Sequence, residues 1–141
     1  MKVEIKKFRS ALLLAINTFD NVPLDLKDFP KGACEVSSVM LMTYLYSCGH
    51  SNISYFSGVR FPSDGGQEES HTFLKYKNFF IDITGSQFDD CKDEIIFEAD
   101  HQLHKSFKGK DRGESDIYKY SDQGKVSYQP FYEKTIELLN I

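Results

Sequence analysis

The chain has 141 residues, with 17 Lys plus Arg against 21 Asp plus Glu and a formal net charge of -4. This length predicts a single domain over residues 1–141, and an aromatic content of 14% excludes a disordered chain. The acidic balance argues against nucleic acid as the main partner. No apolar run approaches the roughly 20 residues of a membrane-spanning helix, so we expect no membrane association.

Apolar residues recur at helical spacing near the start of the chain and predict an amphipathic helix over about residues 2–19. They are Phe8, Leu12, Ile16 and Phe19. The apolar stretch 11–16 is short and no cleavage motif of small residues follows it, so we expect a helix rather than a signal peptide. A loop with Pro23, Pro30 and Gly32 comes next.

The second predicted helix runs from about Ala33 to Cys48 and ends at Gly49, which suits the left-handed position after a helix. Its middle, VMLMTYLY, is apolar on nearly every side. A helix of this kind is usually buried all round. We therefore expect it to run through the centre of the domain.

The third region is mostly β. Tyr and Phe mark a strand over 53–59, and a polar loop, PSDGGQEES, follows. Two further strands, His71–Tyr76 and Phe79–Thr84, flank the pair Lys77 and Asn78, which predicts a β-hairpin with a two-residue turn.

The last third of the chain is harder to assign. Residues 89–103 fit a helix, although 95–97 also fit a short strand. The charged segment 105–116 predicts a mobile surface loop. A strand pair at 118–120 and 125–128 and a closing helix at 131–139 complete the prediction. The fold class is therefore α+β, with a buried helix that carries Cys34 packed against an antiparallel sheet.

Cys34 stands in the first turn of the predicted central helix. The N–H groups of a first turn have no helical partner, and the helix dipole is positive at this end. A thiolate is stabilised there, which activates it as a nucleophile. The same N–H groups can stabilise an oxyanion on a substrate carbonyl.

A thiol nucleophile needs a base and a group that orients the base. With a turn at Lys77 and Asn78, Tyr76 pairs with Phe79 and Phe73 pairs with Asp82. His71 and Asp82 then project from one face as diagonal neighbours, close enough for imidazole and carboxylate to meet. The register thus predicts Cys34 as nucleophile, His71 as general base and acid, and Asp82 as the orienting carboxylate.

These residues resemble the papain-like and transglutaminase-like cysteine hydrolases, in which cysteine, histidine and aspartate occur in this order. In the transglutaminase-like branch the cysteine follows a Gly-x motif and begins a buried helix, the histidine begins a strand as His-x-aromatic, and the aspartate stands in Asp-x-Thr. The matching segments are Gly32-Ala33-Cys34, His71-Thr72-Phe73 and Asp82-Ile83-Thr84. The resemblance spans about residues 30–88. It implies a papain-like/transglutaminase-like core and an acyl-enzyme that water or an amine resolves.

The chain departs from this pattern in its oxyanion donor. Papain-type enzymes place a glutamine a few residues before the cysteine, whereas Asp28, Phe29 and Pro30 stand here. The N–H of Cys34, helped by Ser37 or Gln87, would have to serve instead.

The other chemically active side chains are expected to be structural. Cys48 is expected to pack at the end of the buried helix, and Cys91 is expected to be inert because acidic neighbours raise a thiol pKa. His101 and His104 share a helical spacing that, with Asp100 or Cys91, would suit a metal, but the motif is incomplete and a solvated face is favoured. No metal and no cofactor is implied.

The main hypothesis is a cysteine-dependent amide hydrolase or acyltransferase: a thiol peptidase, a glutamine deamidase or a transglutaminase-like enzyme. Its substrate would be a peptide or protein amide, such as a glutamine side chain. An odd count of three cysteines favours a reducing compartment such as the cytoplasm. The alternative is a non-catalytic binding module, of an inhibitor or immunity type, that keeps the same fold. A metal-dependent enzyme at His101 and His104 is a third option, and the oligomeric state is left open.

Overall fold

The structure is a computed structural model that describes residues 1–62, 64–122 and 126–139. Within these ranges the fold is α+β, and a five-stranded antiparallel sheet has the order β4-β3-β2-β1-β5. The strands of this sheet are β1 (Ile53–Arg60), β2 (Glu69–Tyr76), β3 (Phe79–Asp82), β4 (Ile96–Glu98) and β5 (Lys108–Asp111). The helices are α1 (Lys2–Thr18), α2 (Cys34–Ser47), α3 (Gln102–Lys105) and α4 (Gln129–Leu139), with 3-10 turns η1 (Leu24–Leu26) and η2 (Gly85–Gln87).

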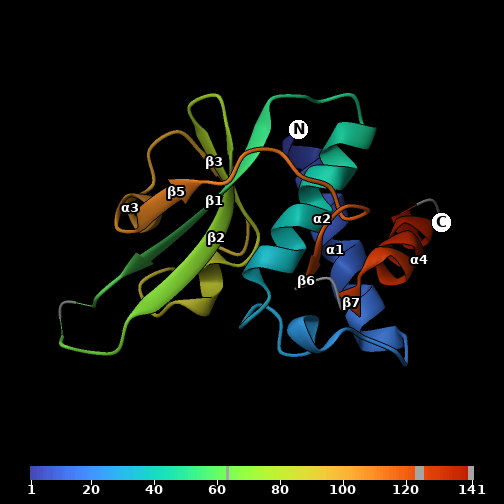
Figure 1. Ribbon diagram of the computed structural model, residues 1–141, viewed down its shortest axis with the longest axis horizontal. Helices are drawn as coiled ribbons and strands as arrows, with labels where there is room; N and C mark the ends of the chain where they lie inside the picture. Colours follow the sequence, from blue (N-terminus) through green and yellow to red (C-terminus); the bar gives the residue numbers. More distant parts are fainter. Residues whose placement is uncertain (63, 123–125, 140–141) are drawn as a thin grey trace.

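Helix α2 occupies the middle layer, between the sheet on one side and α1 and α4 on the other (Figure 1). Its sequence explains this position, because apolar side chains surround it and no polar face is left for solvent. The prediction of a buried central helix is confirmed. No helix among the described residues is both long enough and apolar enough to cross a membrane.

The hairpin of β2 and β3 has the predicted register. Tyr76 pairs with Phe79 and Leu74 with Ile81, around a turn in which Lys77 has a φ of 53°. A positive φ matches the right-handed twist of the strands in a two-residue turn. β3 ends at Asp82, two residues earlier than predicted, because the chain then turns into η2.

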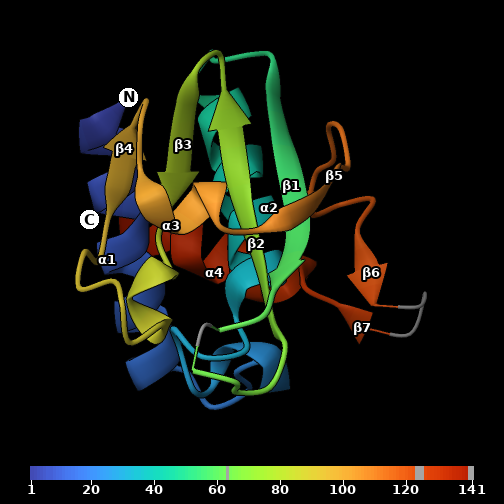
Figure 2. The same cartoon turned by 90° about the vertical axis from the view of Figure 1, so that its left-hand side faces the viewer.

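The segment after η2 covers the other face of the sheet with a small second core (Figure 2). This core is formed by Phe88, Cys91, Ile96, Leu103 and Phe107. Of the two predictions for 89–103, the helix over the whole segment is wrong and the short strand near 95–97 is confirmed: the chain forms the three-residue strand β4 and the four-residue helix α3. Ile96 decides the outcome, because it pairs with Asp82 at the edge of the sheet and is fully buried.

The segment 105–116 is not the loop that its charges predict. Lys108–Asp111 forms β5 and pairs antiparallel with β1. The backbone of β5 pairs with β1 while all four residues stay exposed, so the charged side chains do not have to be buried when the strand forms. Gly109 permits the close crossing, since a Cβ there would collide with the carbonyl oxygen of Ser57. Exposed lysines on an edge strand also discourage pairing with other chains.

A second, two-stranded sheet joins β6 (Ser121–Asp122) and β7 (Val126–Ser127). The predicted strand pair at 118–120 and 125–128 is therefore displaced at its first member and shorter at its second. Lys125 lies outside the described residues. α4 matches the predicted closing helix and begins two residues before it.

Candidate active site

Cys34 is the first residue of α2 and is half-buried. The residue before it, Ala33, is the N-cap and makes no side-chain hydrogen bond to the helix. An alanine has no acceptor with which to cap a helix, so the first-turn N–H groups are left for another partner. The helix therefore presents a thiol and free backbone donors at the same end. α2 and β2, the strand that carries His71, begin at the same end of the molecule (Figure 2).

His71 lies in the first half of β2 and is only 1% exposed. Its Nε2–H donates to Oδ2 of Asp82 at 2.6 Å, across the β2–β3 hairpin. The ring packs against Phe88 and Phe107, with centroid distances of 4.9 and 5.4 Å. Aromatic walls on two sides and a fixed hydrogen bond hold the imidazole in one orientation.

Asp82 is fully buried and accepts hydrogen bonds at both of its oxygens. Oδ2 accepts from His71 and, at 2.8 Å, from Nε2–H of His104. Oδ1 accepts from the backbone N–H of Thr84 at 2.9 Å and from its hydroxyl at 3.3 Å. Burial opposes ionisation of this carboxyl, but the charge of His71 and the histidine hydrogen bonds outweigh it and hold its pKa well below the usual range. Asp82 is therefore ionised, and both histidines must carry a proton on Nε2.

The pKa values of the two histidines on this carboxylate are shifted in opposite directions. Burial alone would lower the pKa of His71, but Asp82 and then the nearby Cys34 thiol outweigh burial and raise it to about 9. Burial does lower the pKa of His104, with Asp82 only partly compensating. At neutral pH the site therefore holds an imidazolium at His71 and a neutral imidazole at His104, which separates their chemical roles.

The second ring nitrogen of His71 shares an unusual state with that of His104. Nδ1 is buried and has no hydrogen-bond partner among the described residues. Cys34 nevertheless lies near enough for its thiol to contribute to the pKa of His71. The structure thus brings together the three residues that the sequence predicts as nucleophile, base and orienting group.

Sequence reasoning missed His104 as a member of this cluster. The expected solvated face is wrong for this residue, which is 2% exposed and stacks on Phe80 at a centroid distance of 4.8 Å. His101 is more exposed and faces Asp93. The sequence did carry a signal for the burial of His104. Leu103 and Phe107, which flank this histidine, are both buried, and their spacing marks an apolar side of the segment 103–107 that includes His104.

Cys34 and His71 line a cavity of about 820 Å³, here called the Cys34 cavity. β1, β2 and β5 supply most of its wall, and α2 supplies Cys34 and Glu35. Basic residues of and beside β5 form one side: Lys108, Lys110 and Arg112. Cys34, which is half-buried, and His71, whose side chain is fully buried, both belong to the lining of this cavity.

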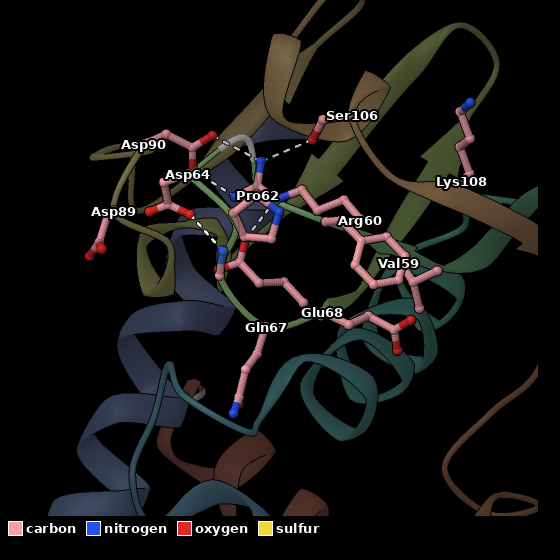
Figure 3. Close-up of a pocket in the computed structure, with 13 residues that line it drawn as sticks. Val59, Arg60, Pro62, Asp64, Gln67, Glu68, Asp89, Asp90, Ser106 and Lys108 are labelled. Atoms are coloured by element: carbon pink, nitrogen blue, oxygen red, sulfur yellow. Dashed lines mark hydrogen bonds and ion pairs between the residues drawn. The ribbon is translucent and has the colours of Figure 1, made fainter.

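A second cavity of about 1120 Å³ adjoins the first and shares Val59 and Lys108 with it. We call it the Arg60 cavity (Figure 3). Arg60 donates to both oxygens of Asp90, at 2.8 and 2.9 Å, and to Glu69 at 2.9 Å. This cavity includes part of the predicted polar loop, of which residue 63 lies outside the described residues. The carboxylates that line it are Asp64, Glu68, Glu69, Asp89 and Asp90.

Two groups of described side chains have donor atoms close enough to hold a metal ion: His71 with Asp82 and His104, and Cys91 with Asp93 and His101. In the first group, N···O distances of 2.6 and 2.8 Å are those of strong hydrogen bonds, and the protons on Nε2 occupy the positions that a metal would need. Hydrogen bonding is therefore a sufficient explanation of this arrangement.

The remaining predicted helpers have other positions. Cys48 is exposed, so the expectation that it packs in the core is wrong, because α2 ends there and turns outward at Gly49. Burial raises the pKa of Cys91, and nearby carboxylates add to the effect. The amide of Gln87 donates to the carbonyl oxygen of Thr84 at 3.1 Å. Ser37 is fully buried, and its hydroxyl has no partner among the described residues.

No protein-family model matches the chain, and no curated protein and no solved structure is significantly similar to it. What the site does is therefore inferred from its own residues.

Proposed function

We propose that the protein is a cysteine-dependent amide hydrolase or acyltransferase with a papain-like, transglutaminase-like architecture. The observation that carries the proposal is the buried His71, which is fixed by Asp82 through Nε2 and is left unpaired at Nδ1 beside Cys34. An unpaired buried polar atom costs stability, and Nδ1 of His104 is also unpaired, so the thiol is what distinguishes His71. Cys34 contributes to the pKa of His71, whereas the pKa of His104 is set by burial, Asp82 and two neighbouring histidines.

The chemistry follows from the positions of these groups. The proton of the Cys34 thiol passes to Nδ1 of His71, the thiolate attacks the carbonyl carbon of an amide, a C–S bond forms, and the π electrons move to the oxygen. First-turn N–H groups of α2 stabilise that oxyanion. As the intermediate collapses, the C–N bond breaks and His71 gives its proton to the leaving amine.

The thioester that remains is resolved by a second nucleophile. Water or an amine gives a proton to His71 as it attacks the acyl carbon, the C–S bond breaks, and the thiolate of Cys34 is restored beside the protonated His71. Asp82 keeps the imidazole in one tautomer through both halves of the reaction. A peptidase, a glutamine deamidase and a transglutaminase-like enzyme share these steps and differ in the acyl donor and acceptor.

The alternative of a non-catalytic binding module is less well supported. A module without chemistry is expected to fill the space in front of the cysteine and histidine. Here the lining of the Cys34 cavity includes both residues, and the Cys34 thiol is only half-buried.

Competition between the three thiols tests the proposal. We expect iodoacetamide to alkylate Cys34 faster than Cys48 at neutral pH, as measured by mass spectrometry of peptides, and His71→Ala to slow only the reaction of Cys34. Cys48 is an internal control for accessibility, because it is exposed whereas Cys34 is half-buried. Burial raises the pKa of the Cys48 thiol and slows its own reaction, so the decisive readout is the effect of His71→Ala on Cys34. Alkylation of Cys48 first, or no effect of His71→Ala, would rule out an activated Cys34.

A further inference from the structure

We propose that the Cys34 cavity selects a peptide acyl donor that carries an acidic side chain next to the reacting amide. This inference rests on the proposed function and adds the substrate class. Its support lies in the charge and the position of the residues that line the cavity.

The sign of the charge in this cavity is opposite to that of the whole chain. The chain has a net charge of -4, whereas three cationic side chains line the cavity against one carboxylate, Glu35. That carboxylate accepts a hydrogen bond from the hydroxyl of Tyr120. Lys108 and Lys110 are exposed and take no part in the ion pairs between described residues. Their charge is available to a ligand.

The two lysines line the same cavity as Cys34 and His71, and the sheet register relates their strand to His71. His71 is directly opposite Gly58 of β1, and Gly58 is directly opposite Gly109 of β5. Lys108 and Lys110, on either side of Gly109, pair with Val59 and Ser57, which line the cavity with them and with Cys34. By strand alternation these lysine side chains leave the sheet on the face opposite to the His71 side chain. Two glycines in line with His71 keep this row free of side chains. A peptide whose amide lies at Cys34 and His71 therefore has its neighbouring side chains next to β5.

The adjoining Arg60 cavity would reject the same acidic group. Five carboxylates line it, and the charge of Arg60 is already met by Asp90 and Glu69. Lys108 stands on the opposite side of this cavity from Asp89 and Asp90 (Figure 3). An acidic side chain of the substrate is therefore attracted to one cavity and repelled by the other, which fixes the direction in which the peptide binds.

The unpaired Nδ1 of His71 is a second observation that points to a ligand in this cavity. It is buried, it belongs to a residue that lines the cavity, and it has no partner among the residues that the structure describes. The reacting end of the acyl donor belongs beside this nitrogen, and the acidic side chain belongs beside β5.

Binding without turnover tests the inference. The Cys34→Ala variant would be titrated, by fluorescence polarisation, with two labelled glutamine hexapeptides whose termini are blocked. One peptide has glutamates on both sides of the glutamine, and the other has lysines. We expect the acidic peptide to bind about tenfold more tightly at low salt, with a difference that shrinks as salt screens the charges.

A pair of charge-reversal variants supplies the control. Lys108→Glu with Lys110→Glu, in the Cys34→Ala background, should abolish the preference for the acidic peptide. Lys6→Glu with Lys7→Glu changes the net charge equally on exposed positions of α1, outside the cavity, and should keep the preference. Equal binding of both peptides, or equal effects of both double variants, would overturn the inference.

These outcomes are separate from those of the alkylation experiment. A preference for the acidic peptide in a protein whose Cys34 is not activated would leave the inferred specificity standing and remove the enzyme. An activated Cys34 without a charge preference would do the reverse.

Discussion

The Cys34 cavity and the Arg60 cavity share a wall at Val59 and Lys108 but hold their charges in different ways. Behind the Cys34 cavity, the pair of His71 and Asp82 is completely removed from water. In the Arg60 cavity, the Asp90 carboxylate that pairs with Arg60 is 56% exposed. The larger cavity is thus a solvated ion-pair network, whereas the smaller one holds a buried charge and an unsatisfied nitrogen. The larger cavity is therefore not the one with the buried charge behind it.

The burial of charge explains why these networks should respond differently to mutation. A buried pair is held by low dielectric and by hydrogen bonds that water cannot replace, so loss of one partner is costly. An exposed pair exchanges each lost contact for water and is screened by salt. The comparison can therefore be tested by removing the carboxylate of Asp82, behind the Cys34 cavity, and that of Asp90, in the Arg60 cavity.

Asp82→Ala should produce the largest loss of stability. Four donors, from His71, His104 and Thr84, lose their acceptor at once in a buried place. We expect the free energy of unfolding to fall by about 3–5 kcal/mol in urea denaturation. A loss below about 1 kcal/mol would mean that the carboxylate is as replaceable as a surface charge.

His104→Phe should have a smaller effect on stability. The phenyl ring can keep the stacking on Phe80, so that the variant removes mainly the hydrogen bond to Asp82. We expect a loss of about 1.5–3 kcal/mol in urea denaturation, because the acceptor is charged. Alkylation of Cys34 should slow less than in His71→Ala. If the two variants slowed it equally, His104 and not His71 alone would govern the thiol.

The stability of the folded protein should fall as the pH rises from about 6.5 to about 9. The pKa of His71 is raised to about 9 in the folded state, above its ordinary value, so the folded form binds the proton more tightly. That contribution is complete below the unfolded pKa and is lost as the pH passes through the folded one. Thermal denaturation at several pH values measures it. His71→Gln should show no such fall, and an unchanged slope in that variant would assign the effect to other groups.

Asp90→Ala should have the smallest effect, although it removes two hydrogen bonds from Arg60. Arg60 keeps Glu69 and its position over the rings of Phe88 and Phe107. We expect a loss of about 0.2–1 kcal/mol in urea denaturation, which shrinks further at high salt. A loss as large as that of Asp82→Ala would remove the distinction between the two cavities.

The half of the site that lies on the hairpin could be predicted from the sequence. A two-residue turn at Lys77 and Asn78 sets which residues of β2 and β3 face each other, and alternation along the strands does the rest. The position of Asp82 beside His71 follows from counting. Pro30 and Gly32 likewise limit where α2 can begin, so the sequence placed Cys34 in the first turn of the helix, of which it is the first residue.

The other half could not be predicted, because it depends on contacts between distant segments. His104 reaches Asp82 only after β4 and α3 have folded over the sheet, and nothing in its own neighbours encodes that carboxylate. The strand β5 has charged, exposed side chains throughout, so no hydrophobic alternation marks it. Its partner is the backbone of β1, which a sequence pattern does not reveal.

The short separation between His71 and Asp82 has a consequence for the order of folding. These residues are 11 positions apart on one hairpin, a structure that forms within about 1–10 μs. Cys34 is on another element and reaches His71 only when α2 docks on the sheet. The thiol is therefore expected to meet its base late, after the sheet has closed behind it. In a nascent or partly unfolded chain Cys34 has not yet met His71, so the activation proposed for its thiol appears only when the fold is complete.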